Sequence, residues 1–341
     1  MGSALRRRRV VVLVHPALVP PDSLSGHSPE AINEWKTEYH VVRTLRRLGH
    51  DVRVLGVQDE LLPIRELVAE WHPHIVFNLL EEFHGITEFD QHVVSYLELL
   101  RIPYTGCNPR GLTIARDKAL SKKIAAYHRI RTPRFATFHR RHRVRRPKDL
   151  PFPLIVKSLT EEASKGIAQA SVVYSDEELA ERVAFVHSRV ESDAIAEEYI
   201  EGREIYVAAF GNLRTTVLPA WELLFENLAP GAAAIATARV KHNLRYQEER
   251  GIFQQQAMDL PEKVADRLIR TTRRLYHLLH LTGYARIDYR LRDDGELFFL
   301  EANPNPEIAP EEEFASAAKA AGIEYPALLQ KLLNLGLNAT C

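Results

Sequence analysis

The sequence predicts an α/β protein of three domains. Short apolar runs alternate with amphipathic helical segments in the N-terminal third, and a strand pair joined by a tight turn is expected near the C-terminus. Alternating strands and helices indicate a parallel sheet, because parallel strands need crossover connections. At 341 residues the chain is too long for one hydrophobic core of ordinary size. We place the domains at residues 1–113, 114–202 and 203–341.

The N-terminal domain is predicted to be a small Rossmann-like unit. Strands are expected at 10–15, 51–57, 74–79 and 102–105, and helices at 31–48, 64–71 and 90–100. Such folds bind ligands at the carboxyl ends of their strands, so polar loops should gather there. The apolar run at 10–14 is too short for the core of a signal peptide and is assigned to a buried strand.

The other two domains mix strands and helices less regularly. In the central domain we expect a helix at 115–128, strands at 152–158, 166–174 and 194–199, and a helix at 176–190. The C-terminal domain should hold a strand at 204–210, an irregular stretch at 226–251, a helix at 262–279, a β-hairpin and a last helix at 327–335. Irregular stretches of that length inside compact domains are usually functional or mobile.

The composition narrows the classes of function. Lys and Arg together number 45, as do Asp and Glu, so the net charge is zero and general nucleic-acid binding is disfavoured. A basic run at 139–147 would suit an anion or RNA, but it lacks interleaved aromatic residues and is interpreted as a solvated connection. Cys107 and Cys341 cannot form a disulfide framework, and no apolar segment is long enough to span a bilayer. We therefore expect a cytoplasmic protein without a membrane partner.

The segment 286–306 carries the strongest chemical signal. Asp294-Gly295 is a typical two-residue hairpin turn, and a turn there places Asp288 opposite Glu301. Two carboxylates that face each other across a ladder repel unless a cation lies between them, and Mg²⁺ suits such a pair. A hydrated, solvent-facing hairpin is the alternative. Alternation gives a polar face with Arg286, Asp288, Glu301 and Asn303, and an apolar face with Ile287, Tyr289, Leu291, Phe298, Leu300 and Ala302.

The hairpin resembles the metal-binding hairpin of ATP-grasp ligases, and the D-alanine–D-alanine ligase-like branch is the most similar. The resemblance rests on Arg286-Ile-Asp288 and on Glu301-Ala-Asn303-Pro. It extends in the same order over nearly the whole chain and implies an ATP-grasp fold. The other matching segments are Phe77-Asn78-Leu79, Ile102-Pro103-Tyr104-Thr105-Gly106, Asp117-Lys118 with Lys122, Ile155-Val156-Lys157 with Ser164 and Gly166, and Glu197-Glu198-Tyr199-Ile200 with Glu204.

The resemblance implies a role for each matching residue. Lys118 and Lys157 would neutralise the phosphates of ATP, under a loop that includes Ser164 and Gly166. The segment from Glu197 would hold the nucleoside, through the backbone of Glu198 and Ile200 for adenine and through Glu204 for ribose. Asp288, Glu301 and Asn303 would hold two Mg²⁺ ions, with Mn²⁺ as a substitute. Arg286 would stabilise a tetrahedral oxyanion, and Lys241 would reach the γ-phosphate from a closing lid.

The activity implied is ligation of a small-molecule carboxylate to an amine through an acyl phosphate, in a homodimer. Substrate-binding residues depart from the family, however. Ala163 and His242 replace the serine and tyrosine that fix the first substrate, and Ala31 replaces a glutamate for which Glu34 or Glu38 would substitute. His15 and His84 are further candidates for contacts with substrate.

The second-substrate position is rich in acids. Where the family holds a carboxylate with a glycine and a serine, this chain has Asn305-Pro306-Glu307 and Glu311-Glu312. These acids repel a carboxylate and suit a cationic amine, so we expect a product other than D-alanyl-D-alanine. The alternatives are a D-alanine ligase with a divergent pocket, an ATP-grasp kinase and a catalytically silent nucleotide-binding protein.

Overall fold

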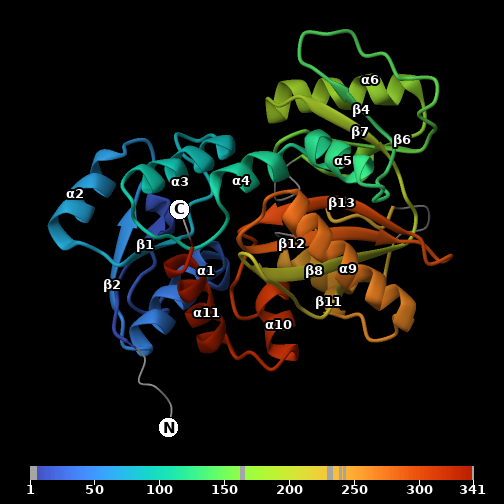
Figure 1. Ribbon diagram of the computed structural model, residues 1–341. Coiled ribbons are helices and arrows are strands. Elements are labelled where there is room, and N and C mark those ends of the chain that lie inside the picture. The colour runs from blue at the N-terminus through green and yellow to red at the C-terminus, as the bar shows by residue number, and fades with distance from the viewer. Residues whose placement is uncertain (1–5, 162–165, 229–232, 238–239, 241–242, 340–341) are drawn as a thin grey trace.

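The computed structural model describes residues 6–161, 166–228, 233–237, 240 and 243–339. Its strands form three sheets that follow one another along the chain. Figure 1 shows them as a blue N-terminal part, a green central part and an orange C-terminal part. The predicted α/β class is confirmed. The predicted domain boundary at 113 lies inside a helix and the one at 202 lies between two strands, and the division itself stays a prediction.

The N-terminal sheet is parallel and is buried on both faces, as its βαβ connections require. Val10, Val12 and Val14 point to one face, and Val11 and Leu13 to the other. The strand expected at 102–105 is reduced to a single bridge between Val76 and Tyr104. The elements are β1 (Arg9–Val14), α1 (Pro29–Arg47), β2 (Asp51–Gly56), α2 (Leu62–Trp71), β3 (Ile75–Asn78) and α3 (Asp90–Leu99), in strand order β2-β1-β3.

The helix expected at 115–128 is two helices, α4 (Pro109–Arg116) and α5 (Lys118–Tyr127). Asp117 separates them because its backbone is extended and its side chain accepts a hydrogen bond from the Leu120 N–H (2.8 Å) as an N-cap. The strand expected at 166–174 is reduced to β6. The central sheet contains β4 (Phe135–Phe138), β5 (Leu154–Ser158), β6 (Val172–Val173) and β7 (Ala194–Glu198) in the order β4-β7-β5-β6, covered by α6 (Asp176–Phe185) and a π-helical turn (Val186–Val190).

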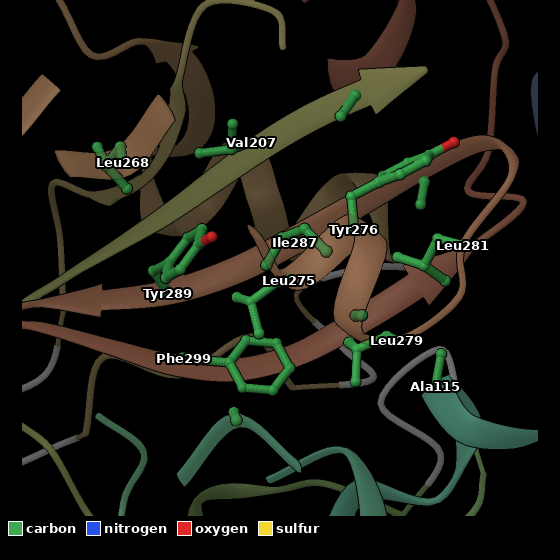
Figure 2. Packing of buried hydrophobic residues seen from close by; sticks show 14 of the residues in the cluster. Ala115, Val207, Leu268, Leu275, Tyr276, Leu279, Leu281, Ile287, Tyr289 and Phe299 are labelled. Carbon is green, nitrogen blue, oxygen red and sulfur yellow. The ribbon is translucent and has the colours of Figure 1, made fainter. Parts of the chain in front are cut away.

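The C-terminal sheet is antiparallel, and α9 packs its apolar side against it. Figure 2 shows Leu275 of α9 close to Ile287 and Phe299 of the hairpin strands. The stretch expected to be irregular at 226–251 contains α8. The strands are β8 (Arg203–Gly211), β9 (Thr215–Val217), β10 (Trp221–Phe225), β11 (Ile252–Gln256), β12 (Gly283–Leu291) and β13 (Leu297–Pro304), in the order β11-β10-β8-β12-β13 with β9 beside β8; the helices are α8 (Leu244–Arg250), α9 (Glu262–Leu278), α10 (Glu313–Ala320) and α11 (Tyr325–Leu337).

The β12–β13 hairpin has the predicted pairing at its functional end. Asp288 lies opposite Glu301, and Arg286 lies opposite Asn303. The predicted turn is wrong by one residue, because the Arg292 N–H donates to the Glu296 carbonyl (3.0 Å) and three residues form the loop.

A β-bulge at Leu300 restores the register between the loop and the functional end. Tyr289 pairs with Phe299, so Leu300 is left without a partner in the ladder. Phe299 therefore faces the core, together with Leu297. The predicted apolar face is corrected at Phe298 and Leu300, which are only partly buried.

The last helix of the chain packs on the first sheet. Leu328, Leu332 and other leucines of α11 share one hydrophobic core with Val10 and Val12 of β1. Figure 1 shows α11, in red, beside the blue α1. The two ends of the chain thus build one core.

Candidate functional site

A small pocket of about 50 Å³ lies between the central and C-terminal sheets. Its apolar walls come from Ile155, Ile167, Ile235 and Leu300, so the bulge at Leu300 helps to form it. The structure thereby brings together predicted nucleotide and metal residues from five strands and the loop after β7. These are Lys157, Glu197, Glu198, Ile200, Glu204, Asp288 and Glu301.

The polar rim at Glu204 is held in place by its neighbours. Arg290 donates to one carboxylate oxygen of Glu204 (2.8 Å), and the Tyr206 hydroxyl donates to the other (2.9 Å). Arg290 also donates to the carbonyl of Gly202 (2.8 Å) and packs near the Tyr199 ring. Arg290 was not among the predicted site residues, although the alternation that indicated Arg286 and Asp288 continues to this residue.

The backbone near Glu198 is only partly available to a ligand. The N–H of Glu198 donates to the Arg134 carbonyl (2.8 Å), and that of Tyr199 donates to the Pro153 carbonyl (2.9 Å). An adenine edge therefore cannot use these two N–H groups without breaking protein hydrogen bonds.

Glu197 lines the pocket and is the centre of a buried charge triad. Its side chain is 1% exposed and lies 3.1 Å from the Lys122 ammonium and 3.3 Å from the Lys157 ammonium. Burial opposes ionisation, but the two ammonium groups outweigh it and lower the pKa of Glu197. Lys122, noted in the sequence without a role, also donates to the carbonyl of Leu300. The triad therefore connects the central sheet to the bulge of the hairpin.

The two hairpin carboxylates are paired with cations of the protein. Arg286 holds Asp288 through Nε and Nη2 (2.7 and 2.9 Å), and the Asn303 amide donates to the same carboxylate (2.9 Å). The Lys118 ammonium lies 3.8 Å from Glu301 and donates to the Glu161 carbonyl (2.7 Å).

The donor set fits a hard divalent cation. Asp288 and Glu301 face each other, and Asn303 adds a carboxamide oxygen, all of which are oxygen ligands of the kind Mg²⁺ prefers. Within the described residues, no three His, Cys, Asp or Glu side chains form a ready metal cage. A cation that keeps waters and takes nucleotide phosphates as ligands fits this arrangement better than one that needs a full protein cage.

Arg286 is clamped from a second side by Glu313, which the sequence analysis missed. Nη1 of Arg286 contacts the Glu313 carboxylate, and the guanidinium lies over the Tyr206 ring (4.7 Å to its centre). Glu313 opens α10, and its carbonyl accepts a hydrogen bond from the Trp221 indole (2.7 Å).

The predicted acidic residues after the hairpin meet α1. The helix is kinked at Trp35, and the next residue, Lys36, places its ammonium 3.4 Å from Glu307 and in direct contact with Glu312. The Thr37 hydroxyl donates to Glu307 (3.2 Å). Glu307 and Glu312 therefore already hold one cation of the protein.

The remaining predicted substrate residues are dispersed. His15 lies 3.9 Å from Glu82, His84 has a left-handed backbone (φ 60°) and donates its N–H to Gln58, and Glu34 is exposed on α1. None of these three lines the pocket. Gly166 also has a left-handed backbone (φ 76°). Ser164, Lys241 and His242 lie outside the described residues, as do Ala163 and Cys341.

Glu38 should make the stability of the protein depend on pH. It is 6% exposed, and burial, reinforced by Glu307, raises its pKa to about 7. A raised carboxyl pKa favours the protonated folded state, so stability falls as pH rises from about 4.5 through 7. Glu38→Gln should therefore exceed the wild type in unfolding free energy at pH 8 by up to about 3 kcal/mol, and match it near pH 4. Urea unfolding at both pH values measures this difference.

The matched control is Glu34→Gln, one turn earlier on the exposed side of α1. It should change the unfolding free energy little at either pH. An equal difference between Glu38→Gln and the wild type at pH 4 and pH 8 would contradict the raised pKa.

Comparison with known proteins identifies the family. A family model described as "D-ala D-ala ligase C-terminus" matches residues 122–334, which is more than half of the chain. The chain belongs to this family. It is 32% identical to the D-alanine–D-alanine ligase of Nitratidesulfovibrio vulgaris (strain DP4), covering 88% of this chain and 91% of the relative. It is 31% identical to the uncharacterized protein y4sG of Sinorhizobium fredii, covering 86% and 85%.

Solved structures of the family share the fold. The D-alanine–D-alanine ligase from Bacillus anthracis, crystallised with ATP, superposes with a TM-score of 0.74 at 24% identity, covering 97% of each chain. The ligase from Coxiella burnetii gives a TM-score of 0.70 at 19% identity. The predicted ATP-grasp fold is confirmed.

The family sets the class of reaction. The protein is an ATP-dependent enzyme that forms C–N bonds, with small-molecule substrates, ATP and a divalent metal. In the part of the chain that the structure describes, no helix has both the length and the apolar character to cross a bilayer.

Proposed function

We propose that this enzyme uses ATP and Mg²⁺ to join a carboxylate substrate to a cationic amine through an acyl phosphate. The observation that carries the proposal is the Lys36 ammonium held by Glu307 and Glu312. Groups that hold one ammonium suit another, and they disfavour the carboxylate of an α-amino acid.

ATP is proposed to bind in the pocket. Adenine would lie between the apolar walls, ribose would bond to Glu204, and the phosphates would meet Lys118 and Lys157. The clamped orientation of Glu204 supports its role, since a preorganised acceptor loses little freedom on binding. Asp288, Glu301 and Asn303 would hold two cations, which would neutralise the charge of the phosphates.

The reaction has two steps. A carboxylate oxygen of the first substrate attacks the γ-phosphorus, and the bond to ADP breaks. The amine first loses a proton and then attacks the carbonyl carbon of the acyl phosphate. The tetrahedral intermediate loses a second proton as inorganic phosphate leaves. Arg286, fixed on β12 by two carboxylates, is the donor proposed to stabilise the tetrahedral oxyanion. Lys241 is proposed to contact the γ-phosphate.

The second-substrate site is proposed to adjoin Arg286. Glu312 precedes Glu313, whose carboxylate contacts the Arg286 guanidinium, and Glu307 follows β13. An amine bound at these acids would therefore approach the oxyanion donor. Glu38, buried near Glu307, would add a further acid, and Glu34 would act only after a shift of α1.

The proposal also includes features that extend beyond the pocket. We place the domains at 1–113, 114–202 and 203–341, and we propose a homodimer in the cytoplasm. Light scattering of the purified chain measures the oligomeric state. His15, His84 and His242 remain proposed as contacts with substrate.

The direct test measures ADP release from Mg·ATP with pooled carboxylates, with and without pooled amines that include D-alanine, basic amino acids and polyamines. Release that needs both pools, with a product mass equal to their sum minus water, supports the proposal. Preferred use of D-alanine as both substrates would overturn the cationic-amine assignment. Release with a phosphorylated product and no need for an amine would indicate a kinase.

Glu312→Ser should lower kcat/KM for the preferred cationic amine by about 10–100-fold, because one charge partner of the ammonium is lost. The ATP KM should stay unchanged, since Glu312 does not line the nucleotide pocket. Glu324→Gln, an exposed acid just before α11, is the control and should behave as the wild type. An equal loss for cationic and neutral amines would contradict a role in charge recognition.

A further inference from the structure

The guanidinium of Arg286 is shared between two buried carboxylates. Nε and Nη2 donate to Asp288, and Nη1 donates to Glu313. Asp288 is 4% exposed and Glu313 is 5% exposed, so all three groups are shielded from water. The positive charge of a buried Arg between two acids is fully neutralised, and each of the two carboxylates contributes to neutralising it.

The role proposed for Asp288 conflicts with its contacts. A carboxylate that binds a divalent cation beside a guanidinium brings two positive groups together in a shielded site. The Arg286–Asp288 contact must therefore weaken when the metal binds. If Asp288 were its sole partner, Arg286 would become an unpaired buried charge, which strongly destabilises a folded protein.

We propose that Glu313 is a positioning residue that retains Arg286 in the site when Asp288 turns to the divalent cation. The ion pair at Nη1 persists, and the edge formed by Nε and Nη2 is released. That edge then becomes available to donate to the reacting carbonyl. This last consequence rests on the proposed ligase function, whereas the coupling between Glu313 and metal binding does not.

The experiment titrates Mn²⁺ into the full-length protein without nucleotide and follows free Mn²⁺ by electron paramagnetic resonance. In Glu313→Gln, Arg286 keeps Asp288 as its sole carboxylate partner, so the metal must compete with a stronger pair. The dissociation constant for Mn²⁺ should rise about tenfold. Glu313→Asp keeps the charge and should recover most of the affinity.

The control variant is Glu222→Gln. Glu222 is also a buried acid in the C-terminal sheet, and it pairs with Arg203 (2.7 Å) away from the metal residues. It should lower thermal stability without changing Mn²⁺ affinity. If Glu313 had a purely structural role, Glu313→Gln would also lower thermal stability without changing Mn²⁺ affinity. That result would overturn the proposal.

A double variant tests whether the effect passes through Arg286. In Arg286→Met, Asp288 has lost its guanidinium partner, so adding Glu313→Gln should change Mn²⁺ affinity by less than twofold. A full tenfold further loss would show that Glu313 acts on the metal by another route and would overturn the proposal. Failure of the ligase assignment appears separately, as absent ADP release by a wild-type protein that still shows the coupling.

Discussion

Glu301→Gln should lower ATP turnover by about 10³-fold while leaving the protein folded. Glutamine keeps the shape of the side chain but loses the charge that faces Asp288 across the ladder. A carboxylate that positions the metal acts on charge that develops during phosphoryl transfer, where single electrostatic contacts are worth about 10²–10³-fold. ADP release under saturating Mg·ATP measures the change.

The control for Glu301 is Glu296→Gln, on the same hairpin beside the turn. Glu296 pairs with Arg131 (3.1 Å) at the surface, and its substitution should leave turnover within about twofold of the wild type. Turnover of Glu301→Gln within about tenfold of the wild type would remove Glu301 from the proposed metal ligands.

Glu197→Gln should give the largest loss of stability among the substitutions considered. The change leaves the ammonium groups of Lys122 and Lys157 close together in a buried site without their shared counter-charge. Removing one partner of a buried ion pair costs about 3–5 kcal/mol. Urea unfolding at pH 7 measures the loss.

The pH dependence gives a second check on Glu197. Because the folded pKa is lowered, the stabilisation by its charge is present above the unfolded pKa of about 4.3 and is lost as pH falls through the folded value. The difference between wild type and Glu197→Gln should therefore shrink in acid. Glu249→Gln, in an exposed helical pair with Arg245, should cost no more than about 0.5 kcal/mol at any pH. A similarly small loss for Glu197→Gln would contradict the triad.

The sequence predicts the centre of the hairpin because strand alternation is a local property. The pairing of Asp288 with Glu301 was predicted from a two-residue turn and the period of two. The real loop is one residue longer, and the bulge at Leu300 offsets that residue, so the predicted pairing is recovered. The bulge at Leu300 does not follow, since the carbonyl of Leu300 is bound by Lys122, which lies 178 residues earlier. Local patterns carry no information on that contact, and two residues of the apolar face were therefore assigned wrongly.

The charge partners of the site were missed for the same reason. Lys36 meets Glu312 across 276 residues, and Arg286 meets Glu313 across 27. A sequence shows where each charged residue is but not which residue it contacts. An exposed acid and a buried acid that pairs with a cation are the same residue type, so the sequence does not distinguish them. Short strands such as β9 also lack enough residues to show a period. Arg290 could have been predicted, because it continues the alternation of Arg286 and Asp288 along β12.

The position of α11 has a consequence for synthesis of the protein on the ribosome. One face of the first sheet is completed by leucines that are translated about three hundred residues after Val10 and Val12. Domains generally fold as they emerge, but this face of the sheet is complete only once α11 has been made. Until then Val10 and Val12 are covered only in part, by Val41 and Leu45 of α1, and the incomplete core is expected to bind chaperones. Emergence of α11, more than emergence of the first strands, should set the moment at which the N-terminal part becomes resistant to protease.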